Sequence, residues 1–134
     1  MSDLIQKMHQ LALDVRKNSH SPYSGFKVGV CLLSKEGHFY AGCNMENAAY
    51  PDGLCAESCA LGALVSAGDK EITDVLVVAD SKALCAPCGG CRQKLSELST
   101  SNTKIHLCDL KGLRKTLTMQ ELLPFSFSLH TMEK

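Results

Sequence analysis

The sequence has no excess of charge and no long apolar run, and each absence excludes a class of protein. Its 134 residues hold 14 Lys and Arg against 14 Asp and Glu, so the formal net charge is zero. A chain without a basic surplus has no electrostatic footprint for nucleic acid or for an anionic membrane surface. No segment approaches the roughly 18–20 apolar residues of a transmembrane helix, and the N-terminus does not have the pattern of a signal peptide. We therefore expect a cytoplasmic protein that binds neither nucleic acid nor membrane.

The chain shows no internal repeat, low-complexity tract or linker, and its length fits a single domain spanning residues 1–134. Hydrophobic residues make up 45% of the sequence, an ordinary proportion for a chain with a real core. A helical pattern near the N-terminus precedes two short strands with a tight turn, and strands then alternate with apolar helices. This order predicts an α/β fold, a three-layer α/β/α sandwich with a mixed central sheet.

Residue patterns set the bounds of the expected elements. The predicted helices span 4–15, 55–67, 89–98 and 119–123, and the predicted strands span 28–33, 38–41, 74–79 and 104–110. The β-branched, apolar run at 74–79 indicates a central strand that is covered on both faces. The small basic cluster from Lys111 to Lys115 is interpreted as solvated surface.

Eight cysteines stand out, because clustered cysteines in a reducing compartment indicate metal binding or catalysis before disulfides. Two segments, Cys55-Ala56-Glu57 and Pro87-Cys88-Gly89-Gly90-Cys91, each lie at the predicted start of a helix. Cys55, Cys88 and Cys91 can converge on one zinc ion and leave its fourth tetrahedral position to water. Glu57 can reach that water without binding the metal. A three-ligand zinc with a C-x-E segment followed by P-C-x-x-C is typical of zinc-dependent base deaminases.

These parts predict a hydrolytic mechanism. Zinc lowers the pKa of its bound water towards neutrality. Glu57 then takes the proton from the water, passes it to the ring nitrogen beside the attacked carbon, and later helps to protonate the leaving ammonia. Two helix N-termini beside the thiolates favour the ionised form of the ligands.

Five motifs occur in order between about residues 20 and 128: SPYSGFKVG at 21–29, GCNMENAAY at 42–50, CAE at 55–57, PCGGCRQ at 87–93 and ELLP at 121–124. With them the chain resembles the cytidine deaminases, most closely the small-subunit class that binds zinc through three cysteines and forms homotetramers. The resemblance implies one Zn²⁺ per subunit. It also implies hydrolysis of cytidine and 2′-deoxycytidine to uridine and 2′-deoxyuridine, with release of ammonia, in pyrimidine salvage.

The resemblance also implies roles in substrate binding. Asn44 and Glu46 match the pair that hydrogen-bonds the ribose hydroxyls, and Tyr50 ends the same loop and helps to frame the nucleoside. Phe26 matches the aromatic residue that packs on the pyrimidine, and Phe127 matches one that reaches the pyrimidine of a neighbouring subunit. An amide and a carboxylate suit a neutral sugar, and an aromatic face suits a flat base. Two simpler interpretations stay open: Phe26 as core, and Phe127 as a tail residue packed at an interface.

One departure from the family concerns the residue after the glutamate, which is usually an arginine that bonds the ligand thiolates. This chain has Ser58 there. Three thiolates on Zn²⁺ leave a cluster charge near −1, which weakens zinc as a Lewis acid, and a serine hydroxyl offsets that charge far less than an arginine. Arg92 and the helix dipoles are the candidate substitutes. Alternatively, Arg92 and Gln93 simply cap or pack a helix.

Another zinc arrangement also stays open. Cys85, Cys88 and Cys91 recur every three residues, so a closed structural site with Cys55 as the fourth ligand is an alternative, although it leaves Glu57 unexplained. The other four cysteines are interpreted as small buried hydrophobic residues: Cys31, Cys43, Cys59 and Cys108.

Three other functions share the zinc motifs. A deaminase of a cytosine-containing antibiotic nucleoside differs in the loop where this chain keeps residues 44–47. A polynucleotide editor needs a basic groove, and this chain is neutral. A zinc-stabilised nucleoside-binding module without turnover is consistent with Ser58. All of these bind zinc, so turnover distinguishes between them and metal content does not.

Overall fold

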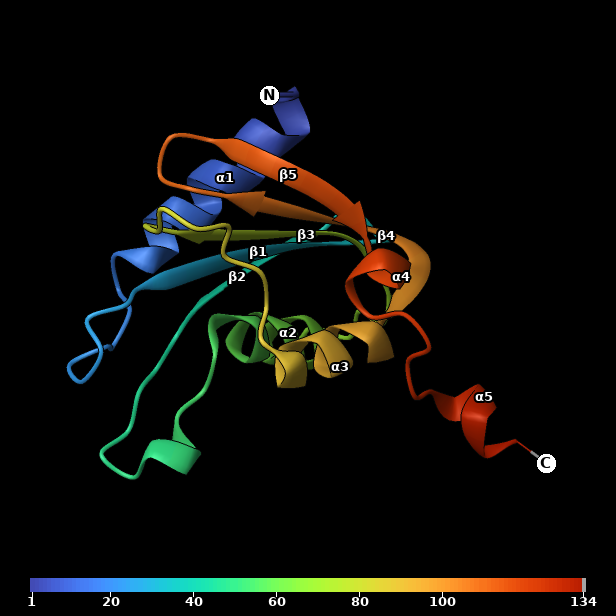
Figure 1. Ribbon diagram of the computed structural model, residues 1–134. Helices are drawn as coiled ribbons and strands as arrows, with labels where there is room; N and C mark the ends of the chain where they lie inside the picture. Colours follow the sequence, from blue (N-terminus) through green and yellow to red (C-terminus); the bar gives the residue numbers. More distant parts are fainter. Residues whose placement is uncertain (134) are drawn as a thin grey trace.

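The framework is one mixed five-stranded sheet in the order β2-β1-β3-β4-β5, seen in the computed structural model, which describes residues 1–133 (Figure 1). The strands are β1 (Val28–Ser34), β2 (Phe39–Cys43), β3 (Ile72–Ala79), β4 (Ser99–Cys108) and β5 (Leu113–Thr118). β3 and β4 pair in parallel, and the other neighbours pair antiparallel. The parallel pair is joined through a helix, as parallel strands require a crossover.

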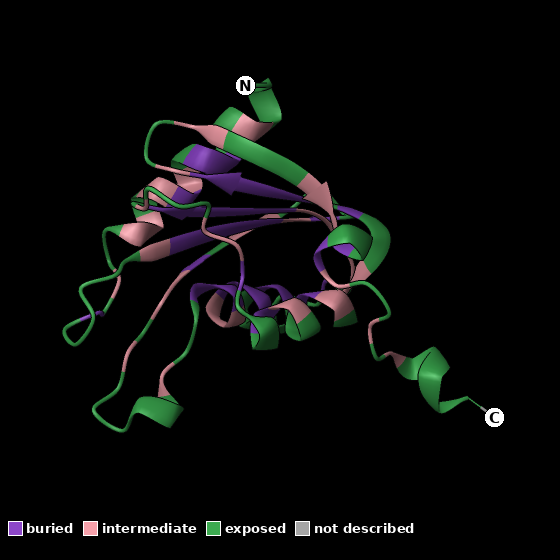
Figure 2. Ribbon diagram, in the orientation of Figure 1, coloured by how far each residue is buried: buried purple, intermediate pink, exposed green. Residues whose placement is uncertain are grey.

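Helices cover both faces of this sheet, which confirms the predicted three-layer arrangement (Figure 1). On one face α1 (Asp3–Arg16) packs through Met8 and Ala12 against residues of β1, β3 and β4. On the other lie α2 (Ala56–Ser66) and α3 (Gly89–Glu97), whose residues join the larger core cluster. Buried residues concentrate in the strands and on the side of α2 that faces them (Figure 2).

Two glycines set how closely a helix approaches each face. A Cβ on Gly42 of β2 would lie 2.5 Å from the backbone nitrogen of Ala60 in α2, and a Cβ on Gly29 of β1 would lie 2.1 Å from the carbonyl oxygen of Ala12 in α1. Neither distance is compatible with a side chain, so the backbones of strand and helix are in direct contact. The position of α2, which begins at the candidate site, therefore depends on Gly42.

The remaining elements are short. They are the 3₁₀ turn η1 (Tyr50–Asp52), α4 (Met119–Leu122) and α5 (Leu129–Met132). A capping box formed by Thr118 and Glu121 begins α4. Beyond α4 the chain extends away from the sheet (Figure 1), and several of its apolar side chains are exposed: Phe125, Phe127, Leu129 and Met132.

Most of the predicted elements are present, and the differences have physical reasons. β4 begins at Ser99, five residues before the expected start, because Ser99 pairs with Ile72 of β3 ahead of an irregularity, and regular pairing resumes at Lys104. β5 begins inside the segment that was interpreted as solvated surface. The basic side chains of this segment are exposed, as predicted, but the strand itself is not indicated by the sequence because an exposed edge strand carries polar side chains. Among the cysteines expected to be buried, Cys31 and Cys108 are buried, whereas Cys43 and Cys59 are only half-buried.

In the part of the chain that the structure describes, no helix combines the length and the apolar character needed to cross a bilayer.

Candidate active site

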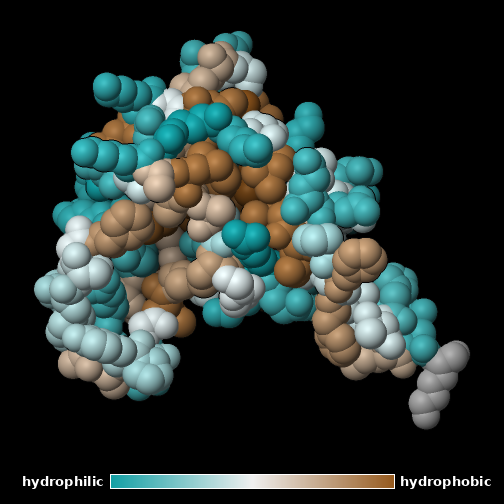
Figure 3. Space-filling view, in the orientation of Figure 1, coloured by the Kyte–Doolittle hydropathy of each residue, from teal (hydrophilic) through white to brown (hydrophobic). Residues whose placement is uncertain are grey.

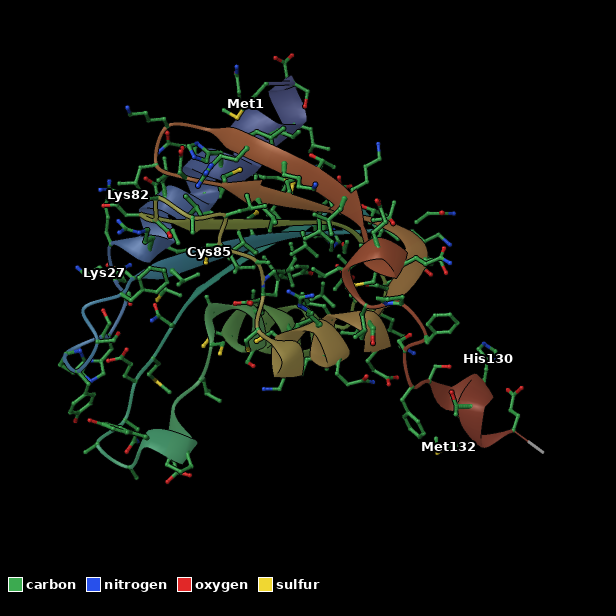
Figure 4. All side chains as sticks on the ribbon, viewed as in Figure 1. Met1, Lys27, Lys82, Cys85, His130 and Met132 are labelled. Carbon is green, nitrogen blue, oxygen red and sulfur yellow. The ribbon has the colours of Figure 1, made fainter. Side chains whose placement is uncertain are left out.

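The candidate site lies where α2 and α3 begin beside one another. Cys55 is the N-cap residue of α2 and Cys88 is the N-cap residue of α3, while Cys91 lies in the first turn of α3. The chain reaches α3 from β3 along a segment that passes Cys85, between the sheet and the helices (Figure 4). Three thiols from two helix starts are thus brought to one place, as the sequence predicted.

The Sγ atoms of Cys55, Cys88 and Cys91 all lie within 4.8 Å of one another. A tetrahedral zinc site with Zn–S bonds of about 2.3 Å separates its sulfurs by about 3.8 Å, so this cluster fits the metal. Among the described residues it is the one group of three or more His, Cys, Asp or Glu side chains with this proximity, and Cys85 is not part of it. The closed four-cysteine site is therefore wrong, and three protein ligands leave a fourth position open.

The surroundings of the three thiols differ. The backbone N–H of Cys91 donates to the thiol of Cys88, and this hydrogen bond lowers the pKa of Cys88. That is the expected effect of a helix N-terminus on a thiolate. Burial instead raises the pKa of Cys55 and of Cys91. The hydrogen bond at Cys88 agrees with the prediction that helix N-termini favour ionised ligands, and zinc binding would favour the thiolate form of all three cysteines.

Glu57 lies in the first turn of α2 and is only 5% exposed. Burial raises the pKa of its carboxyl group, while its own backbone N–H, the Cys91 side chain and the charge of Lys94 act in the opposite direction. A carboxyl group whose pKa is moved upwards towards neutrality can take up and release a proton under ordinary conditions. The arrangement therefore places a carboxyl group with a raised pKa beside the thiol cluster.

Two adjoining cavities lead to this carboxyl group. The inner one, of about 320 Å³, is lined by Cys55, Glu57 and Cys88 together with Phe26 and Cys85. The outer one, of about 460 Å³, lies against the loop over 44–55 and shares with the inner cavity the residues Ser24, Asn44, Glu46 and Cys55. Figure 3 shows the hollow in this face of the molecule, with apolar surface inside it. The combined volume suits a small molecule.

Glu46 lines both cavities, and residues 23 and 24 hold its carboxylate by hydrogen bonds. Its Oε1 accepts from the backbone nitrogens of Tyr23 and Ser24 at 3.0 and 3.1 Å, and its Oε2 accepts from the Ser24 hydroxyl. The Ser24 hydrogen bonds lower the pKa of Glu46. The ionised carboxylate is a fixed acceptor, and Oε2 keeps lone-pair capacity for a donor on a ligand, such as a sugar hydroxyl.

Asn44 is more fully engaged. Its Oδ1 accepts from the backbone nitrogen of Val28 at 3.0 Å and from the Ser19 hydroxyl, and its Nδ2 donates to the carbonyl oxygen of Phe26 at 2.8 Å. Both lone pairs of the amide oxygen are used, so one N–H of Nδ2 remains for a ligand. Asn44 therefore ties the end of β2 to the segment before β1, and can contribute to a ligand only as a donor.

The three aromatic residues lie at different places. Phe26 lines the inner cavity, and Tyr50 lines the outer cavity with its ring against Tyr23 at a centroid distance of 5.6 Å. Phe127 lines neither cavity of its own chain and is 57% exposed, while its carbonyl oxygen accepts from Gln93. The structure thus brings Phe26 and Tyr50 to the site and leaves Phe127 outside it.

The sequence did not indicate the role of Ser24, and it left two interpretations of Arg92 open. The Ser24 hydroxyl, besides donating to Glu46, accepts from the backbone nitrogen of Phe26 at 3.0 Å, so it positions both residues. The sequence signal for this role is that Ser24 lies within the motif at 21–29. Arg92 donates from Nε to the carbonyl oxygen of Pro87 at 2.8 Å and from Nη1 to that of Leu122 at 3.0 Å. Arg92 therefore fixes the backbone just before Cys88, and its guanidinium group is directed at carbonyl oxygens.

Comparison with known proteins shows the family to which the chain is similar. Residues 2–107 match the family model described as the cytidine and deoxycytidylate deaminase zinc-binding region. The chain is 40% identical over 127 residues to the cytidine deaminase of Halalkalibacterium halodurans, covering 95% of this chain and 96% of that one. It is 38% identical to the cytidine deaminase of Sporosarcina psychrophila, covering 92% and 91%.

Solved structures agree with the fold. The crystal structure of cytidine deaminase from Burkholderia pseudomallei superposes with a TM-score of 0.87 at 33% identity, covering 95% of this chain and all of that one. Cytidine deaminase from Mycobacterium tuberculosis superposes with a TM-score of 0.80 at 32% identity, over 96% of this chain and 100% of that one. With the thiol cluster, the buried glutamate and the match over most of its length, the chain belongs to the cytidine and deoxycytidylate deaminase family.

Proposed function

We propose that this protein is a zinc-dependent hydrolase that converts cytidine and 2′-deoxycytidine to the corresponding uridines and ammonia. The observation that carries the proposal is the buried Glu57 beside the cluster of Cys55, Cys88 and Cys91, at the inner end of a cavity whose wall presents the ionised Glu46. Membership of a deaminase family and the named relatives support the same activity.

In this proposal Cys55, Cys88 and Cys91 hold the metal, which when bound supplies the Lewis acidity that makes water an effective nucleophile at neutral pH. The Glu57 carboxylate takes a proton from the attacking water and passes it to the ring nitrogen next to the attacked carbon. It then carries the second proton of the water to the amino group, which leaves as ammonia while the new C–O bond becomes a carbonyl. One water is consumed and one ammonia is released, and Glu57 returns to its starting state.

The rest of the cavity positions the nucleoside. Glu46 accepts a hydrogen bond from a sugar hydroxyl through its free Oε2 capacity, and Asn44 donates to the sugar through Nδ2. Phe26 lies against the pyrimidine in the inner cavity, and Tyr50 limits the outer one. A ligand without the sugar loses these hydrogen bonds, so the free base is expected to be a poor substrate.

The proposal extends to the assembly. The apolar side chains on the segment after α4 are exposed in one chain, among them Phe125, Phe127 and Leu129. A homotetramer in which Phe127 reaches the pyrimidine site of a neighbour gives this segment a partner and gives Phe127 its role. We further propose that the chain forms one domain over 1–134 and acts in the cytoplasm, in pyrimidine salvage, without binding nucleic acid or membrane.

The test is the turnover of a panel of compounds by the zinc-loaded protein: cytidine, 2′-deoxycytidine, cytosine and a cytosine-containing antibiotic nucleoside. Ammonia release and the absorbance change at the pyrimidine ring are followed together. The proposal expects conversion of the two natural nucleosides and little conversion of cytosine. Conversion of the antibiotic alone makes the protein a deaminase of modified nucleosides, and zinc-loaded protein that binds cytidine without converting it is a binding module; either result overturns the proposal.

A further inference from the structure

Ser58 and Lys94 meet one helical turn beyond the thiol cluster. Lys94 Nζ donates to Ser58 Oγ at 3.0 Å, and this hydrogen bond joins α3 to α2. Ser58 follows Cys55 by three residues and Lys94 follows Cys91 by three, so each lies about one turn along its helix from a candidate ligand. The two helices therefore lie beside one another at the thiol cluster and also at the hydrogen bond between Ser58 and Lys94.

The cluster needs a positive charge close to it. Three thiolates on Zn²⁺ carry a net charge of −1, and the carboxylate of Glu57 adds a second negative charge that is nearly buried. Negative charges held together with little access to water are costly unless a cation lies near them. A cation also reduces the electron donation of the thiolates and so preserves the Lewis acidity of the metal.

Two basic residues of α3 lie close enough to be considered. Arg92 is committed to the carbonyl oxygens of Pro87 and Leu122. Lys94 Nζ instead donates to the hydroxyl of Ser58, which follows Glu57 in the chain and lies one helical turn from Cys55. Lys94 itself lies one helical turn from Cys91. This contact between the two helices therefore singles out Lys94.

We propose that Lys94, held in place by Ser58, supplies the positive charge of the thiolate–glutamate cluster from α3, although the residue that follows Glu57 carries no charge. Lys94 acts through its charge and through the Ser58 hydroxyl, and is a positioning residue in this sense. The effect on turnover rests on the proposed function, whereas the effect on metal retention rests on the thiol cluster alone.

The experiment measures how tightly the zinc-loaded protein holds its metal, by competition with a chromogenic chelator at fixed pH and at low and high salt. Lys94→Met removes the charge and keeps an apolar stem, while Lys94→Arg keeps the charge. Lys70→Met is the matched control, because Lys70 is an exposed lysine beyond the far end of α2. We expect Lys94→Met to release zinc about tenfold more readily at low salt, with the difference shrinking at high salt. Lys94→Arg and Lys70→Met are expected to behave like the wild type.

A charge exchange makes the test stricter. The double variant Ser58→Lys with Lys94→Ser moves the ammonium group to α2 and is expected to regain most of the zinc affinity that Lys94→Met loses. Equal zinc retention by Lys94→Met and wild type overturns the proposal, and so does a loss in Lys94→Arg as large as that in Lys94→Met. A lowered unfolding midpoint of zinc-free Lys94→Met that accounts for the loss also overturns it, because the role is then structural.

The two proposals fail in different ways. Zinc competition is measured without substrate, so a zinc-loaded wild type that leaves cytidine unchanged overturns the proposed function and leaves the test of Lys94 readable. A protein that deaminates cytidine, and holds zinc equally well without the Lys94 charge, overturns only the inference about Lys94.

Discussion

Replacing Gly42 with alanine is expected to displace the helix that carries half of the site. The new Cβ would lie 2.5 Å from the backbone nitrogen and 3.0 Å from the Cα of Ala60, and 2.8 Å from the carbonyl oxygen of Ala56. Ordinary contacts begin near 3.4 Å, so the strand and α2 must separate by about 1 Å. All three atoms belong to the backbone of α2, so no side-chain rotation relieves the conflict.

Two consequences follow from this displacement. Overpacking of this kind lowers the free energy of unfolding by about 1–3 kcal/mol. A shift of about 1 Å at the start of α2 also moves Cys55 and Glu57 relative to the α3 ligands, and misplacement on this scale costs about 100-fold in turnover. We expect Gly42→Ala to show reduced zinc content and a turnover number lower by about that factor.

Gly29→Ala provides the matched control. Its Cβ would lie 2.1 Å from the carbonyl oxygen of Ala12 in α1, on the face of the sheet opposite the site. We expect it to lower the free energy of unfolding at least as much, while the folded protein keeps its zinc and its turnover. Urea unfolding, zinc analysis and cytidine turnover on both variants check this. Full turnover in Gly42→Ala, or an equal loss per folded molecule in Gly29→Ala, refutes the reasoning.

Three further predictions concern single side chains. Cys85→Ser is expected to keep its full zinc content and Cys88→Ser to lose most of it, as measured by elemental analysis; loss of zinc in both contradicts the three-ligand site. Ser24→Ala removes the hydroxyl that holds Glu46, whose carboxylate we propose binds the sugar, so KM for cytidine should rise about tenfold with a smaller change in kcat, and an unchanged KM refutes this role. Asp74→Asn should lower the free energy of unfolding by about 2 kcal/mol at neutral pH, because Asp74 Oδ2 lies 2.8 Å from the buried His106. Burial acts to raise the pKa of Asp74, but the hydrogen bond with His106 keeps this pKa below its usual value. The stabilisation is therefore present above about pH 4 and is lost as the pH falls through the lowered pKa. In urea unfolding from pH 7 to pH 2 the free energies of the two proteins should converge, and a constant difference contradicts the assignment.

The metal cluster could be predicted from the sequence because its geometry is local. Cys88 and Cys91 are three positions apart at a helix start, and Cys55 caps the start of the other helix, so each segment presents its thiols with little help from the rest of the fold. The spacing of Cys85 is the same, yet α3 begins only at Gly89 and leaves Cys85 outside the helix. Equal spacing therefore does not mean equal direction once the secondary structure changes.

Contacts between distant segments could not be predicted in the same way. The hydrogen bonds that Glu46 accepts come from residues 23 and 24, more than twenty positions earlier, and they depend on how two loops meet at the end of the sheet. The pair of Ser58 and Lys94 depends on how α2 and α3 lie beside one another. β5 was missed because its pairing with β4 outweighs a polar sequence that indicates surface.

The most direct test of the account is the conversion of cytidine by wild type and Glu57→Gln, with zinc content measured in the same samples. The variant keeps the shape of the side chain and the three thiols, and it cannot carry a proton. We predict that both proteins hold one zinc per chain, that the wild type releases uridine and ammonia in equal amounts, and that the variant loses nearly all of this turnover. Undiminished turnover in zinc-loaded Glu57→Gln would contradict the assignment of Glu57 as the proton carrier.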